Sequence, residues 1–114
     1  MLSGRLLRPA LLRAMTTTVS SPAYPGYGAG LGLFRLDTPC GTVWGHEGGI
    51  PGYVSIAVTD RAGRRSAVVL MPTESDEAIG AAYQAAVTTA VCQMFHRDPL
   101  VASRSPRAPT MAVR

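Results

Sequence analysis

The fold of this chain is decided by the stretch Tyr53-Val-Ser-Ile-Ala-Val-Thr-Asp-Arg-Ala-Gly-Arg-Arg-Ser-Ala-Val-Val-Leu-Met71. Its first part, Tyr53 to Asp60, is rich in β-branched residues and predicts a strand. Asp60 to Arg64 contains Gly63 and predicts a hairpin loop. The continuous apolar run Ser66 to Met71 predicts a second strand that lies in the middle of a sheet and is buried on both faces.

A long helix is expected after these strands, over residues 75–95. Ser75 can cap its first turn, and Asp76 and Glu77 face the positive end of the helix dipole. Apolar residues recur at helical spacing, at Ile79, Tyr83, Ala86, Val87, Ala90, Val91 and Met94. The polar residues Gln84, Thr88, Thr89 and Gln93 lie on the opposite side, so we expect a helix packed on a sheet and no membrane span.

Two further strands are predicted upstream of Tyr53. Ala29 to Leu36 alternates small and large apolar residues and predicts one strand, and Thr42 to His46 predicts another, with a turn over Asp37 to Gly41. The glycines and Pro51 between residues 48 and 52 predict a break. The expected class is therefore α+β: an antiparallel sheet of three to four strands over residues 29–71 with a C-terminal helix on one face.

The two ends of the chain differ from this middle part. Residues 1–16 predict two short helices, Met1 to Leu7 and Pro9 to Thr16, with Pro9 at a first helical position. The Arg-rich start also resembles a transit peptide, but no secretory signal is visible. Residues 97–114 are rich in Arg, Pro, Ser and Ala and predict a disordered tail. One domain over residues 1–96 is expected.

The composition limits the chemistry. The chain is 46% hydrophobic and 16% charged, which favours a folded domain over disorder. It has no Lys and no Asn, so on its own it cannot use a lysine base or an asparagine carboxamide. Its arginines are scattered along the sequence, which argues against nucleic-acid binding. The glycines at 28, 30 and 32 do not have dinucleotide-binding spacing, and no cofactor is expected.

The segment with the most chemical promise is Trp44-Gly-His-Glu-Gly-Gly-Ile-Pro-Gly-Tyr53. It places an imidazole at a strand end beside glycines that permit close backbone approach, which suits the binding of an oxyanion. A glycine-rich hairpin with an incidental histidine fits the same residues. No metal site is expected, because His46, Glu47, Cys40 and His96 do not have metal-ligand spacing.

This segment, with Tyr27-Gly-Ala-Gly-Leu before it and two strands after it, resembles the C-terminal third of the serine β-lactamase and DD-peptidase family of penicillin-recognising enzymes, including the D-alanyl-D-alanine carboxypeptidases. The opening residues Leu2-Ser-Gly-Arg-Leu-Leu, Pro9 and Met15-Thr-Thr are similar to the helical region that precedes it there. The resemblance spans about Met1 to Phe95.

The resemblance implies roles for four residues. The family uses a serine three residues before a lysine, a tyrosine two residues before an asparagine, and a Lys- or His-led triad on a strand. Only the triad is matched here, by His46-Glu47-Gly48. His46 would support the nucleophile, Gly48 would let the substrate approach, and the Gly49 N–H would be one of two oxyanion donors. Glu47 replaces the usual Thr or Ser and would repel a substrate carboxylate, which leaves room for an ester-like substrate.

The two cysteines also bear on the fold. Cys40 and Cys92 would be buried thiols in a reducing compartment and a candidate disulfide in a secreted protein. Some extracellular DD-peptidases, which this chain resembles, have cysteines at similar places that flank the same strand and the same helix. We therefore predict that the two Cα atoms lie within bridging distance, roughly 4.4–6.8 Å.

These observations favour a truncated serine hydrolase that is inactive alone, because no nucleophile can be assigned. Its substrate would be an acyl-type small molecule or peptide, and the family's usual place is extracellular or the cell envelope. The alternative is a non-catalytic interaction module that complements a missing N-terminal half. A third hypothesis is an organelle-targeting peptide followed by a small domain. It is supported only by the first fifteen residues.

Overall fold

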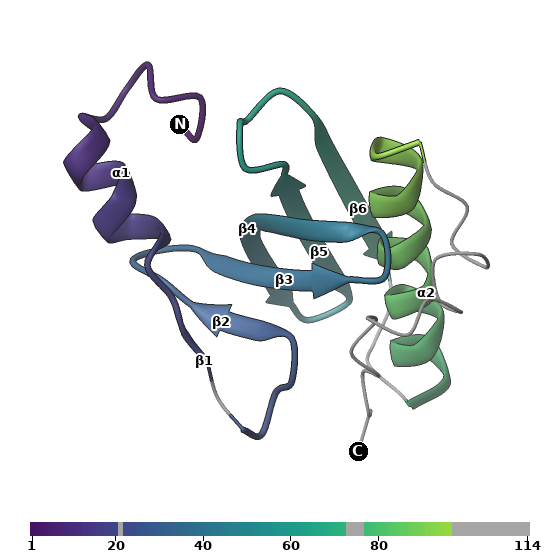
Figure 1. Ribbon diagram of the computed structural model, residues 1–114. Coiled ribbons are helices and arrows are strands. Elements are labelled where there is room, and N and C mark those ends of the chain that lie inside the picture. Colours follow the sequence, from purple (N-terminus) through teal and green to yellow (C-terminus); the bar gives the residue numbers. More distant parts are fainter. Residues whose placement is uncertain (21, 73–76, 97–114) are drawn as a thin grey trace.

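The computed structural model describes residues 1–20, 22–72 and 77–96. Within them, six strands form one antiparallel sheet whose spatial order follows the sequence, and the C-terminal helix covers one face (Figure 1). The elements are α1 Pro9–Thr16, β1 Val19–Ser20, β2 Tyr27–Ala29, β3 Phe34–Thr38, β4 Gly41–Ile50, β5 Tyr53–Thr59, β6 Ser66–Pro72 and α2 Glu77–Met94. The predicted α+β class is confirmed, and the predicted number of three to four strands is wrong.

The segment predicted as one strand, Ala29 to Leu36, is the centre of a hairpin. β2 ends at Ala29, and the Gly30 N–H donates a hydrogen bond to the Leu33 carbonyl at 2.8 Å. Gly32 has a positive φ of 68°, which a residue with a side chain rarely adopts. Alternation of apolar residues continues through this turn, which is why the pattern alone did not reveal it.

The expected break over residues 48–52 is also shorter than predicted. β4 continues through the glycines to Ile50 and pairs with β5 along its whole second half. The reversal is made by Pro51 and Gly52 alone, and Gly52 has a φ of 83°. A type II turn requires a positive φ at its third position, which glycine supplies, and proline is common at its second position.

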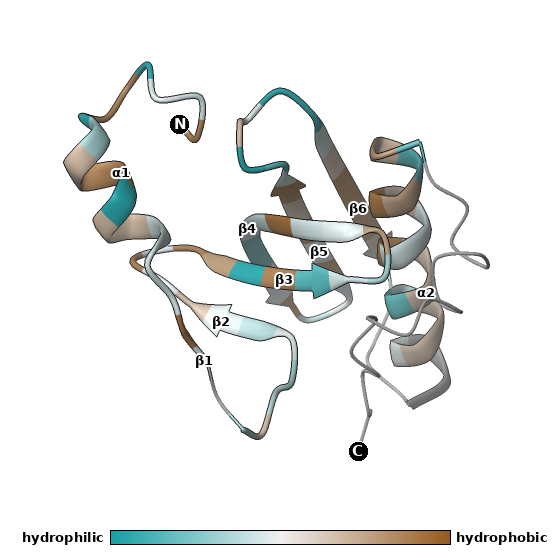
Figure 2. Cartoon of the chain, in the orientation of Figure 1, coloured by the Kyte–Doolittle hydropathy of each residue, from teal (hydrophilic) through white to brown (hydrophobic). Residues whose placement is uncertain are grey.

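β6 is not the central strand that its apolar run predicts. Among the described strands it pairs only with β5, so it lies at an edge of the sheet. Ala67, Val69 and Met71 face α2, whereas Val68 and Leu70 are 60% and 75% exposed on the other face. Figure 2 colours most of β6 as hydrophobic, so an apolar surface is left without cover among the described residues.

The first seven residues form turns rather than the predicted helix. Gly4 has a φ of 77°, and its N–H donates to the Met1 carbonyl at 3.1 Å, which closes a single turn. Leu2 is nevertheless buried, because it packs beside Gly63 in the loop between β5 and β6. The second predicted helix, Pro9–Thr16, is α1.

The core lies between the sheet and α2. It contains the buried side chains of Phe34, Leu36, Val43, Ile56, Val58, Val87 and Val91. The predicted cap residue Ser75 and the tail 97–114 lie outside the described residues. No helix in the described part of the chain is long and apolar enough to cross a membrane.

Candidate active-site strand

The four residues singled out in the sequence lie together on the second half of β4. β3 pairs with β4 only from Gly41 to Gly45, because the chain turns away before Phe34. From His46 onward β4 is paired with β5 on one side, and no described strand occupies the other side. Residues 46–50 therefore form an open strand edge.

The hydrogen-bond alternation of the sheet determines which backbone groups face this edge. The Asp60 N–H donates to the Arg65 carbonyl at 3.1 Å, which sets the alternation along β5. In antiparallel pairs, hydrogen-bonded and non-hydrogen-bonded positions alternate. It follows that His46 and Gly48 exchange hydrogen bonds with β5, and that the N–H and carbonyl groups of Glu47 and Gly49 point to the open edge.

The His46 ring lies near the strand edge and is exposed. Its Nδ1 is hydrogen-bonded to the carbonyl oxygen of Glu47, and its centroid is 6.1 Å from that of Phe34. A carbonyl oxygen can only accept, so Nδ1 carries the proton of this hydrogen bond. In the neutral ring, Nε2 is then an acceptor that can interact with a hydroxyl or a bound substrate.

Glu47 lies on the face of the sheet that α2 covers. Its strand partner is the buried Ile56, and side chains of paired residues share a face. Burial, and then the negative charge of Glu47, raise the pKa of Tyr27 in β2 and of Tyr83 in α2. The charge of Glu47 thus affects the pKa of two tyrosine hydroxyls that are more than fifty positions apart in the sequence.

The glycines keep the strand accessible. A Cβ at Gly48 would meet only Ser55 Oγ at 3.3 Å, and at Gly49 it would meet nothing nearer than 3.9 Å. Gly45 differs, because a Cβ there would lie 2.8 Å from Val58 Cα. Gly45 is therefore needed for close packing of β4 on β5, and sequence reasoning did not assign it this role.

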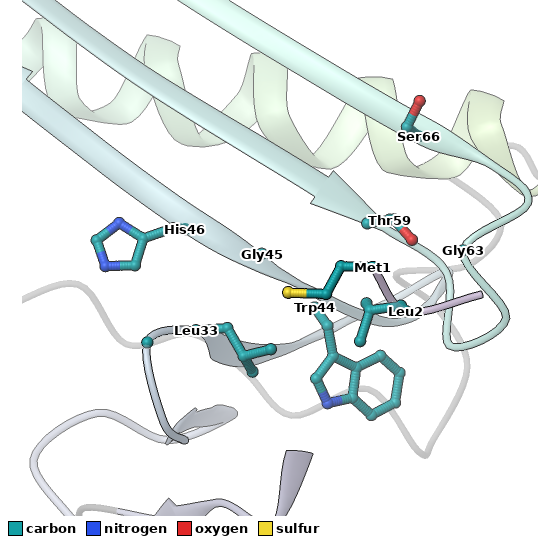
Figure 3. A pocket seen from close by; sticks show the side chains of 10 residues that line it. Met1, Leu2, Leu33, Trp44, Gly45, His46, Thr59, Gly63 and Ser66 are labelled. Carbon is teal, nitrogen blue, oxygen red and sulfur yellow. The ribbon is translucent and has the colours of Figure 1, made fainter. Parts of the chain in front are cut away.

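A cavity of about 290 Å³ adjoins this strand (Figure 3). Its walls are Met1, Leu2, Gly32, Leu33, Trp44, Gly45, His46, Thr59, Gly63 and Ser66. The Arg61 guanidinium lies 5.3 Å from the centre of the Trp44 ring. Trp44 Nε1 is buried and has no hydrogen-bond partner among the described residues. The volume is at the lower end of small-molecule sites, so it suits one side chain or a small group.

No nucleophile can be assigned within the described residues. Ser55 Oγ donates weakly to the Gly48 carbonyl at 3.4 Å, and Ser66 lies at the start of β6. Ser75 lies outside the described part. In the same described part, no three His, Cys, Asp or Glu side chains are grouped so that they could hold a metal ion.

The predicted cysteine pair is confirmed. Cys40 and Cys92 form a disulfide with Cα atoms 5.1 Å apart. It joins the turn between β3 and β4 to the C-terminal part of α2. Gly41 follows this turn, and a Cβ there would meet the Phe95 ring at 3.0 Å. The start of the site strand is thus held against α2 by a covalent bond and by close packing.

The sheet and helix have the transpeptidase-like fold. No family model matches the chain. Over 62% of its length it is similar to a solved D-stereospecific amidohydrolase from a Streptomyces species, with 48% sequence identity and a TM-score of 0.58. That amidohydrolase belongs to the penicillin-binding and β-lactamase-like superfamily. This chain covers only 22% of it.

Proposed function

We propose that this chain is a part of a serine hydrolase domain of the penicillin-binding and β-lactamase-like superfamily, and that its substrate is an amide or ester. The observation that carries the proposal is the open edge of β4. The His46–Gly49 segment lies there, in a chain whose sequence is 48% identical to that of an amidohydrolase over 62% of its length.

In this proposal the Gly49 N–H binds the oxyanion that develops during acyl transfer. The hydrogen-bond alternation places this N–H at the open edge, and a Cβ at Gly49 would meet nothing nearer than 3.9 Å. A fixed N–H donor aimed at a developing oxyanion is among the largest single contributions to catalysis. His46 supports the reacting groups through Nε2, and Gly48 leaves space for the substrate chain.

The chain alone is expected to be inactive. It has no Lys to activate a serine and no Asn for the second family element. One strand edge supplies one oxyanion donor and no nucleophile. The missing groups would come from a further segment of a longer hydrolase domain.

A chimera tests the proposal. The segment of the Streptomyces amidohydrolase that this chain matches is replaced by the corresponding residues of this chain, and hydrolysis of a D-amino acid amide is measured. The chimera is expected to be active and the 114-residue chain inactive. Gly49→Pro removes the N–H and should lower kcat about 100- to 1000-fold, whereas the matched control Gly49→Ala retains the N–H and most of the activity. A chimera whose Gly49→Pro variant keeps full activity would refute the oxyanion role.

The second candidate function is a non-catalytic module that binds a partner through its sheet. The observation that favours it is that, among the described residues, nothing covers the apolar side chains of Val68 and Leu70 or pairs with the outer edge of β6. Such edges pair readily with another strand. An inactive chimera, together with a 114-residue chain that binds the remaining part of the hydrolase domain, would favour this function.

A further inference from the structure

The cavity beside β4 lies on the sheet face that α2 does not cover. Trp44 pairs with Thr59, and Thr59 pairs with Ser66, so these three wall residues form one row across β4, β5 and β6. Val43, the neighbour of Trp44 along β4, is fully buried in the core beneath α2. Since side chains alternate along a strand, the row and the cavity lie on the opposite face. Of the open strand edge, only His46 is a wall residue.

The walls of this cavity are mainly apolar. Its large side chains are those of Met1, Leu2, Leu33 and Trp44, and Figure 3 shows them gathered beside β4. Leu2 and Leu33 are buried, so packing holds these walls in place. Apart from His46, no wall residue has an ionisable side chain. Such walls favour an apolar group of a ligand over a charged one, because a charge inside the cavity would lose its hydration.

A cation lies directly beside these walls. The Arg61 guanidinium is 5.3 Å from the centre of the Trp44 ring, and Arg61 is two positions before Gly63, another wall residue. An arginine that stacks on an aromatic ring can still donate its N–H groups to a carboxylate. The described residues offer Arg61 no ion-pair partner, since the ion pair found among them joins Arg35 to Asp37.

The acidic residue next to Arg61 in the sequence does not neutralise this cation. Asp60 is buried, and its Oδ1 accepts hydrogen bonds from the backbone N–H groups of Arg64 and Arg65. The Gly63 N–H donates to the Asp60 carbonyl at 3.0 Å. These bonds fix the loop that carries Arg61, so the guanidinium stays beside the cavity while the carboxylate is engaged inside the loop.

We propose that this cavity binds a small amphipathic carboxylate, with its apolar body among the Leu2, Leu33 and Trp44 side chains and its carboxylate at Arg61. A fixed cation beside an apolar cavity matches a ligand that is apolar at one end and anionic at the other. The walls include none of residues 47–49. This site is therefore distinct from the oxyanion donor, and the inference does not depend on the proposed hydrolase function.

The 114-residue chain carries its own probe for this site, because Trp44 is its single tryptophan. Trp44 fluorescence is followed at low salt during titration with octanoate, octanol and octylammonium, which share one apolar chain and differ in charge. Octanoate is expected to change the emission and to bind about 3- to 5-fold more tightly than octanol, as for a solvent-exposed ion pair. Octylammonium should bind most weakly, and acetate, which lacks the chain, should not bind measurably.

Variants separate the role of Arg61 from general charge, and the measured quantity is the ratio of the octanol and octanoate dissociation constants. Arg61→Gln should abolish the preference for octanoate, and Arg61→Lys should keep part of it. Arg13→Gln on α1 is the matched control, because it also removes an exposed arginine, and it should keep the whole preference. Ser66→Leu narrows the cavity and should weaken the binding of octanoate and octanol alike.

Four results would overturn the inference. Octanoate that leaves the emission unchanged, or that binds no more tightly than octanol, would show that the cavity does not recognise an amphipathic carboxylate. An undiminished preference in Arg61→Gln, or an equal loss in Arg13→Gln, would remove the specific role of Arg61. Octanoate binding that Ser66→Leu leaves unaffected would place the ligand outside the cavity.

Discussion

Asp60 is a buried carboxylate that closes the hairpin between β5 and β6. Its Oδ1 accepts hydrogen bonds from the backbone N–H groups of Arg64 at 2.7 Å and Arg65 at 3.3 Å. Burial acts to raise the pKa of Asp60, but these two N–H groups and the two guanidinium charges together lower it. Because the folded-state pKa is lowered, the charged form stabilises the fold at pH values above the usual Asp range and loses that effect as pH falls through the folded-state value.

The substitution Asp60→Asn should remove this acid dependence. At pH 7 we expect a loss of about 1 kcal/mol of unfolding free energy, since hydrogen bonds to a charged acceptor become neutral ones. Below about pH 4 the difference between the two proteins should shrink, because the native carboxyl is being protonated. Urea unfolding between pH 3 and pH 7 measures this, and parallel pH profiles for both proteins would contradict it.

The identities of the residues were enough to predict which strand carries the candidate site, but not which residues of other strands and helices lie around it. His46 to Gly49 could be found because glycines around an imidazole are an unusual local pattern. The effect of Glu47 on the pKa of Tyr27 and of Tyr83 could not be found, since it depends on how the sheet and α2 are assembled. The close packing at Gly45 likewise depends on the β5 backbone opposite it.

Among the helices and strands, some could be predicted from the local sequence and others could not. The hairpin between β5 and β6 and the helix α2 are predicted by their turn residues and periodicity. The sequence pattern predicts a single strand over the end of β2 and the start of β3, because the turn at residues 30–33 does not interrupt the alternation of small and large apolar residues. The apolar run of β6 predicts a central strand, and this is wrong because such a run does not reveal whether a strand has one neighbour or two.

The disulfide is the strongest link between elements. Cys40 and Cys92 are 52 positions apart, and closing a loop of this size restricts the unfolded chain. In the chain-entropy model the bond contributes about 4 kcal/mol, which is large for a domain of this size. The double variant Cys40→Ala/Cys92→Ala should therefore lose about that much stability or fail to fold.

Urea denaturation with and without a reductant checks this prediction. Reduction should lower the midpoint of the native protein and leave the double variant unchanged. Each single Ala variant should resemble the double variant, because neither can form the bond. A native midpoint that does not respond to complete reduction would show that the disulfide contributes little.

At the scale of the whole molecule, the described elements cover one face of the sheet and leave apolar residues exposed on the other. α2 and the core lie on one face, while Tyr53, Val68 and Leu70 are exposed on the other. The register aligns Ala57 with Val68 and Tyr53 with Pro72, so apolar residues of β5 and β6 lie side by side on this face, with the Ser55–Leu70 pair between them. This surface adjoins a strand edge with no described neighbour. A further segment of a hydrolase domain and a second copy of this chain could each pack there.

In the absence of such a segment, the chain should associate with itself. Exposed apolar edge strands without charged side chains pair with one another, and β6 carries no charge between Ser66 and Pro72. Sedimentation velocity over concentrations of about 10 to 300 µM, a range where exposed edges associate, should show a concentration-dependent shift towards dimer or larger species. Leu70→Lys should reduce it, because a lysine on an edge strand must lose its hydration to be buried in the interface. Leu11→Lys on α1 is the matched control, because it changes another exposed leucine to lysine. It should leave the self-association unchanged. A monomer at every concentration would mean that the uncovered face is tolerated in water, and the interaction-module function would lose its main support.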